Sequence, residues 1–201
     1  MTPRLHHLPA HEYRRERWRN GLGWTREITR WPHGADAWEW RMSIAEIDRD
    51  AAFSAFPGVD RELVLVHGNG VRLRFADGEV AEVLPPHGKV RFAGEREAFG
   101  ELVDGPTHDF NLMWRRDRWD AALWHRPLVG SMVLFAAAGE TWAVHLLSGH
   151  AVGVHDGERV RLEAGDTALL EAGTARARLA LDGAGALLVM RLQPRSPDAG
   201  A

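Results

Sequence analysis

Four short segments of this 201-residue sequence carry side chains that can hold a small anion. They cover residues 18–28, 38–47, 53–61 and 108–116, and they supply arginine, amide, hydroxyl and aromatic groups. An arginine inside a cavity binds a carboxylate through two parallel N–H···O hydrogen bonds, while flat aromatic rings wall the ligand. Taken one at a time, each segment is equally compatible with a strand or hairpin whose charges are solvated.

The first segment, WRNGLGWTREI, joins a glycine-containing turn to a polar strand. Glycine lets the chain turn sharply and lets a ligand approach the main chain closely. The backbone N–H groups of such a turn can form an anion-binding concavity. A hydroxyl, a guanidinium and a carboxylate follow on the emerging strand. The candidate binding residues of this segment are Trp18, Asn20, Gly21, Gly23, Thr25, Arg26 and Glu27.

The other three segments place polar side chains next to aromatic ones. In 38–47, alternation puts Arg41 and Ser43 on the face opposite Trp38 and Trp40. In 53–61, two Phe and a Pro-Gly turn precede an Asp-Arg pair, and in 108–116 alternation groups an Asp, an Asn and a Met. The sequence does not rank the three candidate anion partners, which are Arg26, Arg41 and Arg61. The candidate binding residues of these segments are Arg41, Ser43, Phe53, Phe56, Arg61, Asp109 and Asn111.

Residue types that carry other chemistries are missing or poorly spaced. The chain has no cysteine, which excludes disulfides, thiolate metal sites and a cysteine nucleophile. Its eleven histidines include no His-x-His pair, and His145, His150 and His155 are five apart, a spacing that changes face on a strand. Nucleophile-elbow, Walker and dinucleotide-binding motifs are also absent. We therefore expect no metal and no cofactor.

The elements that position these segments are predicted to be short strands separated by turns. Period-two alternation predicts strands over 38–47, 63–67, 71–75, 80–84 and 90–92, and later over 143–147, 152–154, 160–163 and 167–170. Asn69-Gly70 predicts a tight hairpin, and 148–150 predicts a turn. Helix is scarce: only 96–103 has room for a turn or two, and Gly100 weakens it.

The turn glycines recur with an offset of about 80 residues. Gly68 matches Gly149, Gly78 matches Gly157, and the glycines at 88 and 94 match those at 165 and 173. This repetition indicates a duplicated β-unit, and many short strands favour a sandwich or barrel. The predicted fold is all-β, with an N-terminal unit over 1–118, a second over 119–193 and a flexible tail over 194–201.

Composition and charge limit the partners of the protein. The formal net charge is −3 and the pI about 6.4, so no basic surplus favours nucleic acid. No apolar run reaches the roughly 18–20 residues of a membrane helix. The N-terminal residues lack the apolar core of a signal peptide, so we expect a cytoplasmic protein without a membrane partner. Exposed strand edges and nine tryptophans favour a homodimer.

The four segments, in this order, resemble the HutD/Ves family. The resemblance implies a bicupin, two cupin-like jelly-roll barrels in one chain, without the usual metal ligands. It further implies a binder of a small carboxylate, such as N-formylglutamate or urocanate, that regulates histidine utilisation. Leu22 departs from the pattern, because it stands where the family has a glycine. The matching residues are Trp18, Asn20, Gly21, Gly23, 25–28, Trp40, Arg41, Ser43, Ala45, Ile47, Phe53, Ser54, 56–58, Asp60, Arg61 and 109–113.

Two other functions are compatible with the same residues. In a metal-free isomerase or hydrolase, Glu27 or Asp109 would be the general base and an arginine would stabilise an anion. Against this stands the lack of an evident nucleophile. In a structural or interaction module, Glu27 and Arg41 would simply pair inside the barrel.

Overall fold

The computed structural model describes residues 2–18 and 21–195, and this part of the chain is built from β-strands and one short 3-10 helix, η1 (Ala10–Glu12). It divides into two compact units, Tyr13–Arg118 and Met1–Glu12 with Trp119–Ala201. The unit that we expected over 1–118 therefore begins at Tyr13. None of the helices found in the described ranges is long and apolar enough to cross a membrane.

The unit Tyr13–Arg118 consists of two antiparallel sheets of six and four strands. The order of the first sheet is β2 (Arg14–Arg17), β3 (Gly23–Trp31), β4 (Trp40–Ile47), β11 (Thr107–Arg115), β6 (Val59–His67) and β9 (Lys89–Ala93). The order of the second is β5 (Ala51–Ala52), β10 (Ala98–Leu102), β7 (Val71–Phe75) and β8 (Val80–Val83). Apolar side chains from both sheets, among them Leu63, Leu73 and Phe92, form one buried cluster.

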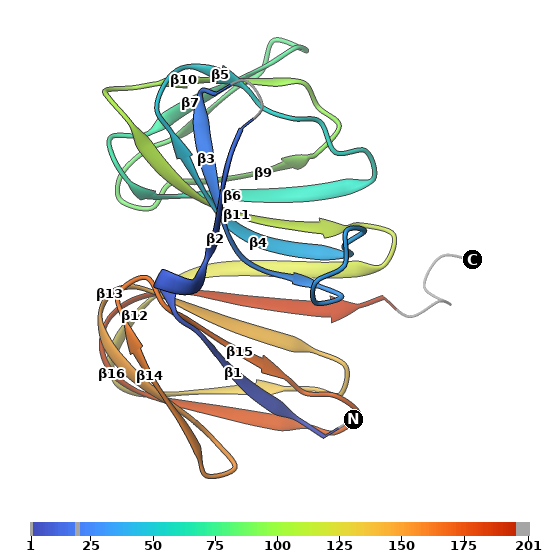
Figure 1. The fold of residues 1–201 in the computed structure, drawn as a ribbon, viewed down its shortest axis with the longest axis vertical. Helices are drawn as coiled ribbons and strands as arrows, with labels where there is room; N and C mark the ends of the chain where they lie inside the picture. Colours follow the sequence, from blue (N-terminus) through green and yellow to red (C-terminus); the bar gives the residue numbers. More distant parts are fainter. Residues whose placement is uncertain (1, 19–20, 196–201) are drawn as a thin grey trace. The chain divides into compact units, whose positions relative to one another are not determined.

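The other unit contains one six-stranded sheet with three long strands (Figure 1). β1, drawn in dark blue, lies beside β15 and pairs with it from Arg4–Glu171 to Leu8–Thr167. This pairing is the reason that the first residues of the chain belong to the second unit. The order is β1 (Arg4–Leu8), β15 (Thr167–Glu171), β13 (Thr141–His155), β16 (Ala177–Pro194) and β12 (Trp119–Ala136), with β14 (Glu158–Glu163) on β13.

The strand registers of the two units show the duplication. Ser43 of β4 lies opposite Asn111 of β11 on the inner face, and Trp124 of β12 lies opposite Val189 of β16 on the inner face of the other unit, 81 and 78 residues later. In both units the same strand neighbours follow, because β6 and β7 correspond to the two halves of β13. The expected all-β fold with two related units is therefore present.

Three local predictions are wrong, because the chain continues or changes sheet where a turn or helix was expected. The hairpin at Asn69-Gly70 does not form, since β6 pairs in one sheet and β7 in the other. Residues 148–150 lie within β13, which bends there with a register shift after Leu146. The segment expected to be helical contains β10, paired with β7. Strands that follow each other in the chain, such as β6 and β7, can lie in different sheets, which local turn signals do not report.

Candidate functional site

The unit Tyr13–Arg118 contains a cavity of about 520 Å³ whose wall includes the inner face of the six-stranded sheet. A volume of this size fits a small metabolite. The lining residues come from β2, β3, β4, β6, β11 and the segment around β5. They are Glu16, Arg17, Trp18, Thr25, Arg41, Ser43, Ala45, Ala52, Phe53, Ser54, Phe56, Arg61, Asn111 and Met113.

Strand register explains why these side chains meet. Residues directly opposite each other in antiparallel strands project from the same face of a sheet. Met113 of β11 lies between Arg41 of β4 and Arg61 of β6, so the two arginines flank it on one face. In the next row of that face, Ser43 lies opposite Asn111. The inner face therefore carries two guanidinium groups beside an amide and a hydroxyl.

Arg61 is buried in this site without a compensating anion. It is 4% exposed, its Nε has no hydrogen-bond partner, and its Nη1 donates to the Ser54 carbonyl at 3.3 Å. The guanidinium carbon lies 5.4 and 5.6 Å from the ring centroids of Phe53 and Phe56. No described carboxylate forms an ion pair with it. Burial, together with the positive charge of Arg41, lowers the pKa of Arg61 to about 10.

Arg41, in contrast, is held by a carboxylate of the neighbouring strand. Its Nε donates to Glu27 Oε2 at 2.7 Å, and Arg30 Nε donates to Glu27 Oε1 at 2.7 Å. A bulge in β3 around Ile28 brings Glu27 and Arg30 onto the same face. Burial alone would raise the pKa of Glu27, but the hydrogen bonds and charges of the two arginines outweigh it and lower this pKa. Glu27 is thus an ionised support of Arg41.

Two further polar side chains on this face have unsatisfied acceptors. Asn111 is 7% exposed, lines the cavity, and its Oδ1 has no hydrogen-bond partner. Asp109 is fully buried one row further along β11, opposite Ala45, and neither of its oxygens has a partner. Burial raises the pKa of Asp109 to about 7. Asp109 is not among the residues that line the cavity.

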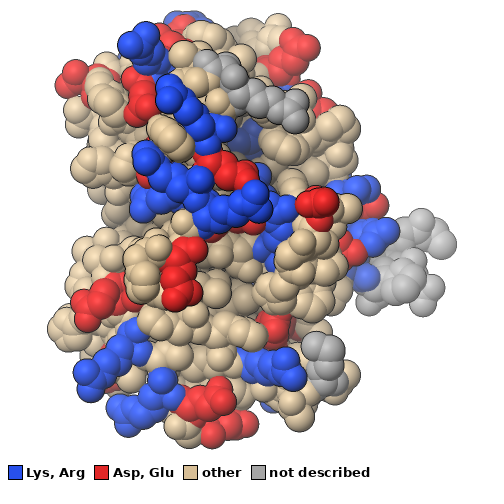
Figure 2. Space-filling view, viewed as in Figure 1, with Lys and Arg blue, Asp and Glu red and all other residues tan. Residues whose placement is uncertain are grey.

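Aromatic side chains form one part of the cavity wall. Trp18 Nε1 donates to Thr25 Oγ1 at 2.9 Å, and the indole packs edge-on against Phe53 at 6.4 Å between ring centroids. Gly23 has no room for a side chain, because a Cβ there would lie 2.4 Å from the Glu46 carbonyl oxygen and 3.2 Å from the Trp18 ring. Arg side chains, with acidic ones between them, lie on the molecular surface over β2 and β3 (Figure 2). Three of these strands' arginines are paired: Arg14 with Glu16, and Arg15 and Arg26 with Glu46.

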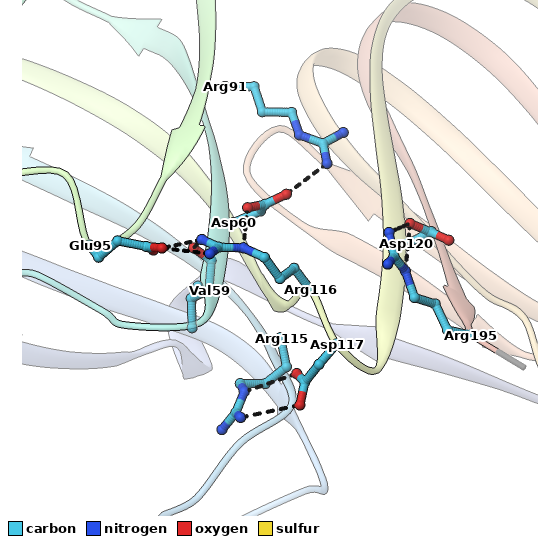
Figure 3. A network of polar contacts seen from close by, with 9 residues as sticks. All are labelled: Val59, Asp60, Arg91, Glu95, Arg115, Arg116, Asp117, Asp120 and Arg195. Atoms are coloured by element: carbon cyan, nitrogen blue, oxygen red, sulfur yellow. Dashed lines mark hydrogen bonds and ion pairs between the residues drawn. The ribbon is translucent and has the colours of Figure 1, made fainter. Parts of the chain in front are cut away.

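An ion-pair network fixes the beginning of β6, where Arg61 lies. Asp60 accepts hydrogen bonds from Arg91 Nη2 and Arg116 Nε, each at 2.8 Å. Arg116 also donates to the Val59 carbonyl at 2.7 Å and to Glu95, whose pKa its hydrogen bonds lower to about 2 (Figure 3). The network ties β6, β9 and β11 together beside Arg61.

The sequence model of one protein family matches residues 10–189 of the chain, and its description is HutD. The chain belongs to the HutD family. Among curated relatives, an uncharacterized 21.2 kDa protein in the hutC 3′ region of Pseudomonas putida is 39% identical over 117 residues, which are 58% of this chain and 61% of that protein. Protein Ves of Cronobacter sakazakii is 44% identical over 102 residues, 50% of this chain and 55% of that protein. These matches therefore span less than two thirds of the curated relatives.

Solved structures extend the HutD likeness over nearly the whole chain. HutD from Pseudomonas fluorescens SBW25 has a TM-score of 0.82 and 28% identity, with coverage of 96% of this chain and 100% of that one. A bacterial pirin from Escherichia coli (TM-score 0.69, 9% identity, 96% and 100% covered) and a Cupin 2 conserved barrel domain protein from Leptotrichia buccalis (0.55, 12%, 85% and 88%) share the fold alone. The expected family and the bicupin fold are confirmed.

The expected binding residues of this HutD-family chain fall into groups in the structure. Glu27 and Asp109 lie on the inner face of the sheet but do not line the cavity. Arg26 lies on the opposite face and forms an ion pair with Glu46 at 2.7 Å. Gly21 and Gly23 shape the turn after β2, and Asn20 lies outside the described residues. Eight line the cavity: Trp18, Thr25, Arg41, Ser43, Phe53, Phe56, Arg61 and Asn111.

Several lining residues were not among the candidates from sequence. Ala45 and Met113 are two positions from Ser43 and Asn111, so the same alternation that selected those residues predicts their position. Glu16 and Arg17 carried no such signal, because only the pairing of β2 with β3 brings them to the cavity. In the part of the chain that the structure describes, no group of three or more His, Asp or Glu residues is arranged to hold a metal ion.

Proposed function

We propose that this HutD-family protein binds a small carboxylate metabolite in the cavity of the unit Tyr13–Arg118 and that the bound state regulates histidine utilisation. The observation that carries the proposal is Arg61, a buried guanidinium that lines the cavity with no described counter-ion. Leaving a charge buried and unpaired costs several kcal/mol, roughly 3–5. A carboxylate next to Arg61 offsets this cost and satisfies its free N–H groups.

The other lining residues support a ligand with both polar and flat apolar parts. Arg41, held in place by Glu27, adds a second positive charge to the site. The aromatic part of the wall consists of Trp18, Phe53 and Phe56. The Oδ1 atom of Asn111 has no hydrogen-bond donor and can accept one from a ligand. These groups fit the N-formylglutamate or urocanate class, because both compounds join a carboxylate to an N–H donor and a planar group.

Binding is favoured over catalysis by the state of the candidate bases. Glu27 is ionised between two arginines, which makes it a weak proton acceptor. Asp109 has a pKa suited to proton transfer, yet it does not line the cavity. A regulatory role in histidine utilisation is supported by the family and by the hutC-region position of the Pseudomonas putida relative.

The test is isothermal titration calorimetry of the purified chain with N-formylglutamate, urocanate, histidine and acetate. We expect a carboxylate of the first two kinds to bind, and Arg61→Met to reduce its affinity at least tenfold. Arg74→Met is the matched control, because Arg74 pairs with Glu101 away from the cavity and its loss leaves affinity unchanged. Absence of binding at millimolar concentration to folded protein would overturn the proposal. Turnover of a bound compound, lost in Asp109→Asn, would favour the enzyme instead.

A further inference from the structure

The unit that contains β12 carries an apolar surface that the cavity does not use. Val129, Val133 and Phe135 are 88%, 44% and 72% exposed, and all three project from one side of β12. β12 is also an edge strand, since it pairs with β16 and with no other strand among the described residues. Soluble proteins rarely leave large apolar side chains clustered at an open edge unless another surface covers them.

Register extends this surface across three strands. Val133 lies opposite Ala180 of β16, and Ala180 lies opposite Val154 of β13, so these three residues form one row. In the next row, Ser131, Asp182 and Val152 lie side by side. We call this surface the β12 face and define it by Val129, Ser131, Val133, Phe135, Val152, Val154, Arg178, Ala180 and Asp182.

The β12 face carries two opposite charges that have no ionic partner in the described chain. Arg178 and Asp182 are both exposed, and they flank Ala180 at equal distances along β16. Asp182 accepts a hydrogen bond from Ser131 Oγ at 2.9 Å, and no ion pair of either residue is found among the described residues. A surface with a positive and a negative group placed symmetrically about an apolar row is complementary to a second copy of the same surface, related to it by a twofold rotation.

We propose that the β12 face binds the β12 face of a second copy of this chain. In this dimer the twofold axis lies along the row of Val133 and Ala180, perpendicular to the strands. The strands of the two copies are then antiparallel. This arrangement places Arg178 of each copy over Asp182 of the other and brings the apolar rows together. An axis parallel to the strands would place Arg178 over Arg178, so the two charges of β16 select the first arrangement. Arg159 and Arg161 of β14 lie at the rim of the face, beside Val154 and Val152.

The dimensions of the β12 face suit a weak homodimer. Three neighbouring strands at a spacing of about 4.8 Å, and seven residues at about 3.4 Å each, give a footprint of roughly 14 by 24 Å. This footprint is smaller than the ~800 Å² per partner of a standard interface, which is typical of a weak, reversible association. This inference concerns a different unit from the proposed ligand site, so either can fail alone.

The experiment is sedimentation equilibrium of the full chain between 5 and 200 µM. We expect a dimer for the natural sequence and at least tenfold weaker association for Arg178→Asp, because like charges then face each other. Asp182→Arg should weaken association equally. The double variant R178D/D182R restores the pairing with its signs exchanged and should recover the dimer, which a merely structural role of these exposed residues would not produce.

The controls separate this face from other surfaces. Val80→Glu changes an exposed apolar residue of the unit Tyr13–Arg118 and should leave the association unchanged. A monomer at 200 µM overturns the proposal, and so does a dimer that R178D and D182R do not weaken. A double variant that stays as weak as the single ones, with an unchanged circular dichroism spectrum, also overturns it.

Discussion

At the scale of single residues, the inner face of the six-stranded sheet concentrates polar groups that lack partners. Buried polar groups in folded proteins are almost always paired. Here Arg61 Nε, Asn111 Oδ1 and both oxygens of Asp109 are buried and unpaired within one face. Such groups reduce stability, and two of them, Arg61 and Asn111, line the cavity of the proposed binding site.

Arg61→Met should raise the free energy of unfolding of the unliganded protein by about 1–3 kcal/mol while it removes ligand binding. Methionine keeps the contacts of the arginine stem with the Phe rings and removes a buried charge without a counter-ion. Urea denaturation of both proteins measures the change. A clear loss of stability would show that Arg61 is paired in solution and would contradict this assignment.

Asp109 should make stability fall as pH rises. Its pKa is about 7 in the folded chain and near the ordinary 3.8 in the unfolded chain, so between these values the folded state binds more protons. The stabilisation is complete below about pH 4 and is lost as pH passes 7. Asp109→Asn keeps the neutral form, so its advantage over the natural protein should grow by about 3 kcal/mol from pH 5 to pH 8. Urea denaturation at pH 5 and pH 8 measures the free energy of unfolding of both proteins. An equal change with pH in the natural protein and in Asp109→Asn would contradict this prediction.

At the scale of elements, the bulge in β3 determines how the second arginine is held. In a regular strand, residues three apart face opposite sides, but Glu27 and Arg30 share one side because the register shifts between Glu27 and Thr29. Glu27 can therefore bind Arg30 and Arg41 at once and fix the guanidinium that lines the cavity.

Glu27→Gln should reduce the free energy of unfolding by about 2–3 kcal/mol, because two largely buried arginines then lose their carboxylate. The matched control is Glu82→Gln, which breaks the exposed pair with Arg72 and should produce no measurable change. Urea denaturation of the three proteins provides the comparison. Equal effects of the two substitutions would mean that the cluster around Glu27 is as solvated as a surface pair.

Alternation in the sequence predicted most strands and the face of Arg41, Ser43 and Asn111, because burial on one side of a strand imposes period two. Alternation could not show that Arg41 and Arg61 line the cavity while Arg26 lies on the opposite face, because the position of each strand depends on its neighbours in the sheet. The bulge at Ile28 likewise follows from pairing, and so does the separation of β6 and β7 into different sheets. Long-range register has no local signature, which is why the turn at Asn69 was misassigned.

At the scale of the whole molecule, the duplication has left one polar copy and one apolar copy. By register and by the face of the sheet, the positions of Arg41, Arg61 and Asn111 correspond to Ala122, Trp142 and Val189. The cavity-lining chemistry is thus confined to one unit, and the other has filled the equivalent positions with packing side chains.

Exchange of one corresponding pair tests this division. Asn111→Val should keep or raise stability by about 1 kcal/mol, because an unpaired buried acceptor is removed, and should weaken ligand binding at least tenfold. Val189→Asn should lower stability by about 3 kcal/mol and leave affinity unchanged, because it places an amide in an apolar core. Thermal denaturation measures the stability of both variants, and calorimetry measures their affinity. Similar effects of the two substitutions would contradict this division between the units.

The pairing of β1 with β15 has a consequence for biosynthesis. Residues 4–8 are translated more than 150 residues before their partner, 167–171. At about 5–20 residues per second, this leaves the first strand without its neighbour for roughly 8–30 s. A bulky fusion before residue 4 would therefore disturb the unit that contains β1 and β15. The unit Tyr13–Arg118 would be less affected, because all of its strands are translated before β15.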